Sequence, residues 1–232
     1  MKLRVRYTKV GKVRFLGNLD LARNWERAIR RAGLPVAYSE GFSPRPKLHY
    51  GLALPMGAES LAEYLDVGLR DDIELDGVAD ALSAAMPVGI EVTDVADVPS
   101  DSIALQAVVE HCTWRFDFDD TTSEVLADAA QRLLERDEVL LTFERKGKPI
   151  TENVRPAVLD LSVTTPPRHG VASLLATIAT KPRSIRPSEF LTCLALEGDA
   201  PRISRIEQWM TIDGHPAPLT MAGAPAVGAS GT

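Results

Sequence analysis

Apolar and polar residues alternate at the start of the chain. Across residues 3–8 the odd positions are apolar and the even positions are polar, with basic residues at Arg4 and Arg6. A period of two sends successive side chains to opposite faces of a strand. The pattern therefore predicts a strand over residues 3–8 with one apolar and one cationic face. After a Val-Gly-Lys turn, we expect the strand to resume over residues 13–16.

A helical period follows this strand. Apolar residues recur at the i, i+4, i+7, i+8 and i+11 spacing from Leu21, which predicts an amphipathic helix from Asn18, as a favourable N-cap, to a stop at Gly33. On the opposite side of this helix lie Arg23, Arg27, Arg30 and Arg31. The predicted helix thus has one apolar stripe and one arginine stripe.

The later patterns complete a β-α-β-β-α-β order and then repeat it more loosely. In the first half we expect strands over residues 48–54, 62–69 and 90–95 and a helix over 76–86. In the second half we expect strands over residues 105–118, 139–145, 158–164, 172–180 and 204–212 and helices over 123–136 and 187–196. This order is typical of the ferredoxin-like fold.

We therefore expect an α+β protein with two tandem ferredoxin-like domains. The first domain covers residues 1–99 and includes a loop at 34–47, and the second covers residues 103–214. Residues 215–232 are rich in Ala, Pro and Gly, and we expect them to form a disordered tail.

Charge is distributed unevenly along the chain. The 26 Lys and Arg residues against 32 Asp and Glu residues give a formal net charge of −6, which excludes a uniformly basic nucleic-acid binder. Counted by segment, residues 1–50 carry +9, residues 51–138 carry −17 and residues 139–232 carry +2. Such asymmetry indicates an interaction surface on one part of a chain. The basic segment favours an anionic partner.

The remaining composition favours a cytoplasmic protein without a membrane segment. The chain is 45% hydrophobic and has no apolar run near the roughly 20 residues that span a bilayer. Its two cysteines, Cys112 and Cys193, form no CxxC motif, so we expect buried free thiols. The four histidines have no ligand spacing. We expect neither a metal site nor a cofactor.

The segment from Tyr38 to Lys47 combines aromatic, proline and basic residues. Aromatic rings beside Arg and Lys are the side chains that stack on unpaired bases and neutralise phosphates. The alternative is a rigid crossover whose aromatic rings fill the core. If the basic elements share one side of the protein, they form a phosphate-binding surface. The candidate RNA-binding residues are Arg4, Arg6, Arg23, Arg27, Arg30, Arg31, Tyr38, Phe42, Arg45 and Lys47.

Motifs for catalysis are weaker. The Gly-Lys pairs lack the preceding glycine of a phosphate-binding loop. His49 and Tyr50 could act as general acid and base in RNA cleavage, but adjacent residues of a strand point to opposite faces. The catalytic residues therefore stay unassigned. Residues 144–148, followed by Asn153 and Arg155, predict a hairpin with a basic end as a second contact region.

Five motifs within residues 1–70 resemble those of the radical-SAM-linked proteins, a bacterial family of unknown function encoded beside, or fused to, a radical SAM protein. They are RFLGNLD at 14–20, ERAIRRAGLP at 26–35, YSEGFSPRPK at 38–47, LPMG at 54–57 and EYLD at 63–66. Members of that family usually carry His where this chain has Asn18 and Arg45. The resemblance implies a radical SAM partner and a link to RNA. A radical SAM cluster needs three cysteine thiolates and this chain has two cysteines, which fits an accessory part.

We therefore expect a non-catalytic RNA-binding or substrate-presenting accessory protein of a radical SAM enzyme, in RNA modification or processing. Two alternatives stay open. One is an RNA-cleaving or RNA-modifying enzyme that uses Lys47, His49 or Tyr50. The other is a protein-interaction module that docks the radical SAM protein through its basic side.

Overall fold

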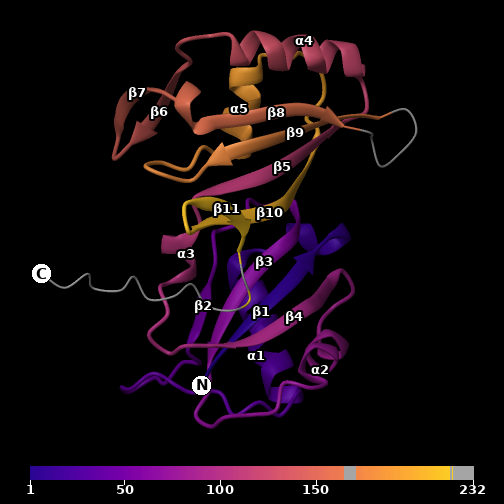
Figure 1. The fold of residues 1–232 in the computed structure, drawn as a ribbon. Helices are drawn as coiled ribbons and strands as arrows, with labels where there is room; N and C mark the ends of the chain where they lie inside the picture. Colours follow the sequence, from indigo (N-terminus) through magenta and orange to yellow (C-terminus); the bar gives the residue numbers. More distant parts are fainter. Residues whose placement is uncertain (165–170, 220, 222–232) are drawn as a thin grey trace, which may run out of the picture. The chain divides into compact units, whose positions relative to one another are not determined.

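The computed structural model describes residues 1–164, 171–219 and 221, and the chain divides into two compact units (Figure 1). Unit 1 comprises Met1–Val109 and the C-terminal segment from Trp209, and unit 2 comprises Glu110–Gln208. Helices and mostly antiparallel strands occur in both units, so the predicted α+β class is confirmed. The predicted domain limits and the tandem ferredoxin-like arrangement stay predictions.

Unit 1 begins with a strand, a helix and two further strands, as its periodicity indicates, although the strand predicted over residues 48–54 covers only residues 48–50. Its elements are β1 (Lys2–Lys9), η1 (Gly11–Phe15), α1 (Asn18–Arg31), β2 (Leu48–Tyr50), β3 (Glu59–Gly68), α2 (Val78–Ala85), β4 (Ile90–Val98), α3 (Leu105–Val108) and β11 (His215–Pro218). The strands run antiparallel in the order β4-β1-β3, and β2 pairs with β3.

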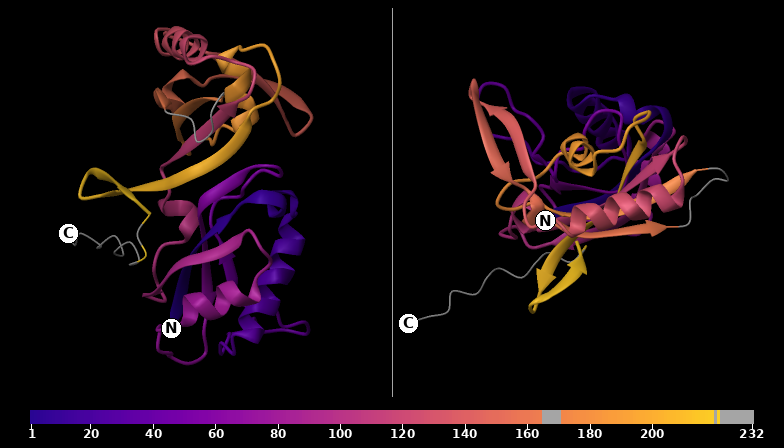
Figure 2. Two further views of the ribbon diagram at one scale, coloured as in Figure 1. Left: turned by 90° about the vertical axis from the view of Figure 1, so that its right-hand side faces the viewer. Right: turned by 90° about the horizontal axis from the view of Figure 1, so that it is seen from above.

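The core of unit 1 lies between this sheet and its two longer helices. The apolar side chains of β1 belong to the same buried cluster as Trp25 of α1, whose ring meets Tyr7 edge-on with 4.9 Å between centroids. Val78 and Leu82 of α2 belong to that cluster too. Both helices therefore cover one face of the sheet (Figure 2), and the apolar face predicted for β1 is the core face.

Two short helices replace predicted strand segments in unit 1. Gly11 has a positive φ of 69°, and the Val10 N–H donates to the Gly89 carbonyl at 2.8 Å. The chain therefore leaves the sheet and forms η1, so the strand predicted over residues 13–16 is wrong. Residues 105–108 form α3 instead of the first part of a strand. At the start of α1 the N-cap is Gly17, and the predicted cap, Asn18, is the first helical residue.

The segment predicted as a tail begins as a strand. Asp213 and Gly214 form the turn between β10 and β11, which pair antiparallel. Their φ values are 50° and 80°. An Asp-Gly pair favours a hairpin turn of this kind, because both central residues need positive φ. Residues 215–218 are therefore ordered, contrary to the expectation of a disordered tail from residue 215. Residue 220 and residues 222–232 lie outside the described part of the chain.

Unit 2 has the same alternation of strands and helices with an added hairpin. Its elements are β5 (His111–Phe118), α4 (Ser123–Leu134), β6 (Leu140–Arg145), β7 (Lys148–Asn153), η2 (Arg155–Ala157), β8 (Val158–Thr164), β9 (Ala172–Ala179), α5 (Pro187–Leu194) and the first part of β10 (Arg202–Ile212). Its strand order is β10-β5-β9-β8, and β6 and β7 form a separate two-stranded sheet. Phe116 of β5 packs on Phe190 of α5 at 5.0 Å between ring centroids.

Candidate nucleic-acid interface

The exposed side of α1 carries a row of arginines. Leu21, Trp25, Ala28 and Ile29 are buried on the inner side of this helix, so its amphipathic pattern is confirmed. Arg23, Arg27, Arg30 and Arg31 are all exposed.

Compensating charge on this helix is limited. Arg23 lies 3.4 Å from an oxygen of the Asp20 carboxylate, an exposed pair of little stabilising value. Arg27 is held by neutral groups, since its Nε donates to the Arg23 carbonyl and its Nη2 donates to the Asn24 side chain. Within the described residues, Arg30 and Arg31 form no ion pair. Two guanidinium groups at the end of α1 are thus open to an anionic partner.

Arg4 does not belong to an RNA-binding surface, contrary to the expectation from the alternating pattern. Its side chain is 1% exposed. Its Nε and Nη2 donate to the two carboxylate oxygens of Asp66 on β3, at 2.8 and 3.0 Å. This bidentate geometry is the strongest form of an arginine–carboxylate contact. Arg4 is therefore a structural residue within unit 1.

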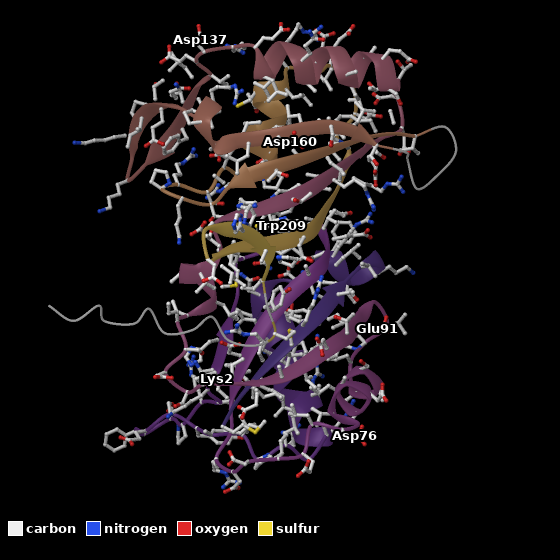
Figure 3. The ribbon with its side chains drawn as sticks, viewed as in Figure 1. Lys2, Asp76, Glu91, Asp137, Asp160 and Trp209 are labelled. Atoms are coloured by element: carbon white, nitrogen blue, oxygen red, sulfur yellow. The ribbon has the colours of Figure 1, made fainter. Side chains whose placement is uncertain are left out.

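Arg6 lies on the same face of β1 as Arg4, away from α1. Its guanidinium carbon is 5.8 Å from the centroid of the Tyr64 ring. The chain covers this face: Lys2, labelled in Figure 3, donates to the Ser102 hydroxyl at 2.6 Å, and the Tyr64 hydroxyl donates to the Leu219 carbonyl at 3.0 Å. The strand and helix arginines point to opposite sides of the sheet, because α1 packs on the apolar face. The hypothesis that they share one side is wrong.

The loop after α1 is a narrow hairpin that projects from unit 1. Isolated bridges pair Val36 with Leu69 and Tyr38 with Pro46. Across its tip the Ser39 N–H donates to the Arg45 carbonyl at 2.8 Å, and the Arg45 N–H donates to the Ser39 hydroxyl at 3.0 Å. These bonds fix the two sides of the tip relative to each other.

The aromatic rings of this hairpin face solvent. Phe42 is fully exposed and Tyr38 is 51% exposed. The alternative in which these rings fill the core is therefore wrong. Arg45 and Lys47 are exposed as well. Gly41, with a φ of 123°, supplies the backbone conformation that turns the tip, which a residue with a side chain adopts only with strain.

The arginine row and the hairpin are adjacent in the chain. Gly33, with a φ of 69°, ends α1 directly after Arg30 and Arg31, and Val36 begins the hairpin three residues later. We call these two exposed groups together the basic surface. It comprises Arg23, Arg27, Arg30, Arg31, Tyr38, Phe42, Arg45 and Lys47.

The candidate acid–base pair does not come together. On β2, His49 pairs with Asp66 of β3 and Tyr50 pairs with Leu65, so their side chains lie on opposite faces of the sheet. His49 is exposed, whereas the Tyr50 hydroxyl is buried. Burial, followed by the nearby Glu26 carboxylate, raises the pKa of Tyr50 well above its usual range. Tyr50 is therefore a neutral hydroxyl at physiological pH.

The second basic region is divided by the structure. Lys146 and Lys148 are exposed at the turn between β6 and β7. Arg155, by contrast, has a structural role, because its guanidinium donates to the carbonyls of Leu134 and Val158 at 2.8 and 2.9 Å. Sequence reasoning missed Arg183, which lies with its guanidinium carbon 3.8 Å from the centroid of the Phe143 ring.

No local motif could have found Arg183. Its partners come from three separate elements, since it also binds Glu189 of α5 at 2.6 Å and lies 3.9 Å from Glu152 of β7. A long-range cluster of this kind leaves no fixed spacing in the sequence.

Three further properties concern the cysteines, metal ligands and membrane-spanning helices. Cys112 and Cys193 are buried free thiols, as predicted. In the described part of the chain, no three His, Cys, Asp or Glu side chains are grouped so that they could hold a metal ion. Among the same residues, no helix has the length and apolar character needed to cross a bilayer.

Comparison with known proteins gives a family but no activity. No curated protein matches the chain significantly. One family model, described as an uncharacterized protein conserved in bacteria, matches residues 2–187. This match covers most of both units. The chain therefore belongs to the DUF2344 family of uncharacterized bacterial proteins.

Proposed function

We propose that the protein is a non-catalytic RNA-binding or substrate-presenting accessory protein of a radical SAM enzyme, and that it contacts RNA through the basic surface. Guanidinium groups without carboxylate partners, as at Arg30 and Arg31, are suited to phosphates. The hairpin adds stacking rings beside them. This combination is typical of proteins that bind unpaired RNA.

The observation that carries the proposal is the position of Phe42. A fully exposed phenylalanine at a loop tip contributes nothing to the core of unit 1. The hydrogen bonds between Ser39 and Arg45 nevertheless join the two sides of the tip. An aromatic ring at the tip of a hydrogen-bonded turn, with cationic residues next to it in the chain, is suited to stacking on a base.

The radical SAM partner is proposed from the motifs within residues 1–70. Those motifs include the hairpin from Tyr38 to Lys47 and most of α1, so they contain every residue of the basic surface except Arg23. A cytoplasmic location is part of the proposal, and the two buried free thiols support it because thiols stay reduced in the cytoplasm.

We further propose that both units are ferredoxin-like. In unit 1 the strand order is β4-β1-β3 with β2 on the outer side of β3, and in unit 2 it is β10-β5-β9-β8. In each unit the first two main strands of the motif are separated by the third, as in a split β-α-β arrangement. The β6–β7 hairpin is then an insertion in the second domain.

The test is RNA retention by charge-reversed variants of the full chain. Arg30→Glu/Arg31→Glu changes the end of α1, and Arg132→Glu/Arg136→Glu changes exposed arginines at the corresponding end of α4 in unit 2. Both variants change the net charge equally. We expect the first to lose most retained total RNA and the second to keep it.

Equal retention by both variants would refute the basic surface as the RNA contact. Recovery of the radical SAM protein with the wild-type chain after nuclease treatment, with no RNA bound in any preparation, would favour the docking module instead. Cleaved products after incubation of the purified chain with total RNA would favour the enzyme.

A further inference from the structure

Unit 1 contains a small cavity that the periodic patterns of the sequence do not predict, although Asn18, Leu54 and Glu63 in its lining belong to quoted motifs. Its volume is about 210 Å³. It lies next to the segment that follows β2. The Gly51 N–H donates to the Tyr64 carbonyl at 2.9 Å, and beyond Gly51 the chain no longer pairs with β3. It is lined by Tyr7, Asn18, Tyr50, Gly51, Leu52, Ala53, Leu54, Glu63, Tyr64 and Gln106.

The Tyr50 hydroxyl is the unusual group in this cavity. It is buried and has no hydrogen-bond partner among the described residues. Buried hydroxyls are almost always hydrogen-bonded, because desolvation without a partner is unfavourable. Its raised pKa keeps the proton on the oxygen. The cavity therefore presents a neutral hydroxyl that lacks a partner until a ligand supplies one.

Glu63 places a carboxylate on the same side of the sheet. Glu63 pairs with Tyr7 across β1 and β3, while Tyr50 pairs with Leu65, so Glu63 and Tyr50 are diagonal neighbours on the helix-covered face. Diagonal neighbours on adjacent strands are about 7–8 Å apart. Glu63 is 6% exposed. Burial lowers the pKa of Lys9, and the negative charge of Glu63 acts in the opposite direction, so the two side chains are near each other. A carboxylate can accept several hydrogen bonds at once.

We propose that this cavity binds a guanine base of the RNA. The Tyr50 hydroxyl donates to the guanine O6, and the Glu63 carboxylate accepts from the N1–H and the 2-amino group. This inference rests on the proposed RNA-binding function and specifies which base of the RNA the protein binds. Adenine presents an amino group and an unprotonated N1 on the same edge, and that N1 would face the carboxylate without a proton between them.

The surroundings of the cavity suit a nucleotide whose base is inserted. Leu19 and Met56 are 77% and 71% exposed and follow closely in the chain after the lining residues Asn18 and Leu54. The Met56 methyl carbon lies 3.9 Å from the position a side chain at Gly17 would take, directly before Asn18. The lining itself combines the apolar Leu52 and Leu54 with the polar Tyr50 and Glu63, which suits a base whose faces are apolar and whose edge is polar.

Binding of free nucleosides to the full chain tests the inference. Ligand-observed NMR titration with guanosine, inosine and adenosine separates the two contacts, because inosine lacks only the 2-amino group. We expect guanosine to bind most tightly, inosine more weakly, and adenosine at least tenfold more weakly than guanosine.

Two variants of the cavity have a matched control. Tyr50→Phe removes only the unpartnered hydroxyl, so it should fold normally and weaken guanosine binding about 2- to 13-fold, the range for one neutral hydrogen bond. Ser100→Ala removes an exposed hydroxyl of unit 1 outside both the cavity lining and the basic surface, and should leave binding unchanged. Ala53→Leu adds side-chain volume at an exposed position of the cavity wall and should abolish binding.

The outcomes separate this inference from the proposed function. Equal guanosine affinity of Tyr50→Phe and wild type, or no measurable guanosine binding by folded wild type, overturns the cavity assignment, even where RNA retention still depends on Arg30 and Arg31. Guanosine binding that survives Arg30→Glu/Arg31→Glu and is lost in Ala53→Leu supports it. If guanosine binds in this way and RNA retention is unchanged in Arg30→Glu/Arg31→Glu, the cavity assignment is supported and the basic surface is refuted as the RNA contact.

Discussion

Replacing Arg4 by methionine should destabilise unit 1 strongly. Arg4 and Asp66 are 1% and 3% exposed, and two hydrogen bonds of 2.8 and 3.0 Å join them. Arg4→Met preserves much of the side-chain volume but leaves the Asp66 carboxylate buried without its cation. Breaking a buried pair in this way costs about 3–5 kcal/mol of unfolding free energy. That is a large part of the about 5–15 kcal/mol that stabilises a typical domain.

Urea unfolding monitored by hydrogen exchange of the β1 amides measures this loss within unit 1, since the two units need not unfold together. Arg30→Met, on the exposed side of α1, is the control and should leave the free energy unchanged within error. Arg4→Met/Asp66→Leu should recover most of the loss, because an apolar pair avoids the desolvation of both charges. A loss below about 1 kcal/mol for Arg4→Met would refute the structural role of the pair.

Two further predictions concern a glycine and a histidine. In thermal unfolding, Gly89→Ala should destabilise unit 1 more than Gly11→Ala. An added Cβ at Gly89 would collide with the Val10 carbonyl, whereas an added Cβ at Gly11 would meet open space. Equal losses of stability in the two variants would contradict the close approach of Gly89 to the Val10 carbonyl. Burial lowers the pKa of His111, so the unfolded chain binds its proton more readily and wild-type stability should fall as the pH drops below about 6.5. His111→Asn should reduce that part of the pH dependence in unfolding curves, and an unchanged slope would contradict the assignment.

The elements that the sequence predicts best have a single strong period. The stripe from Leu21 on α1 lies against the sheet, and the arginines spaced between its members face solvent. The helix end at Gly33 follows from local backbone chemistry as well. These features depend on neighbours in the chain, so a periodic pattern is enough to predict them.

The cationic face of β1 shows the limit of such reasoning. Alternation assigns Arg4 and Arg6 to one face, but it cannot reveal whether distant segments cover that face. The segments that cover this face contain Asp66, Ser102 and Leu219. Each of these residues lies more than 60 positions from Arg4 in the chain. The sequence contains no spacing that links them. Burial of Arg4 therefore becomes visible only in three dimensions.

The cavity of unit 1 was missed for a related reason. The sequence offered Tyr50 only as a partner of His49 in acid–base chemistry and Glu63 only as part of the EYLD motif, and no spacing links the two residues in one site. Their diagonal placement follows from the register of β2 on β3, with Tyr50 opposite Leu65. A change of one residue in that register would send Tyr50 to the other face.

The salt dependence of RNA binding tests the basic surface most directly. The affinity of the full chain for a labelled single-stranded RNA of mixed sequence is measured over a series of salt concentrations, for wild type and for Arg30→Gln/Arg31→Gln. Each phosphate contact to a single strand contributes about −0.7 to the slope of log affinity against log salt, so loss of two contacts should make the slope shallower by about 1.4. Identical slopes for the two proteins would contradict binding of RNA through the end of α1.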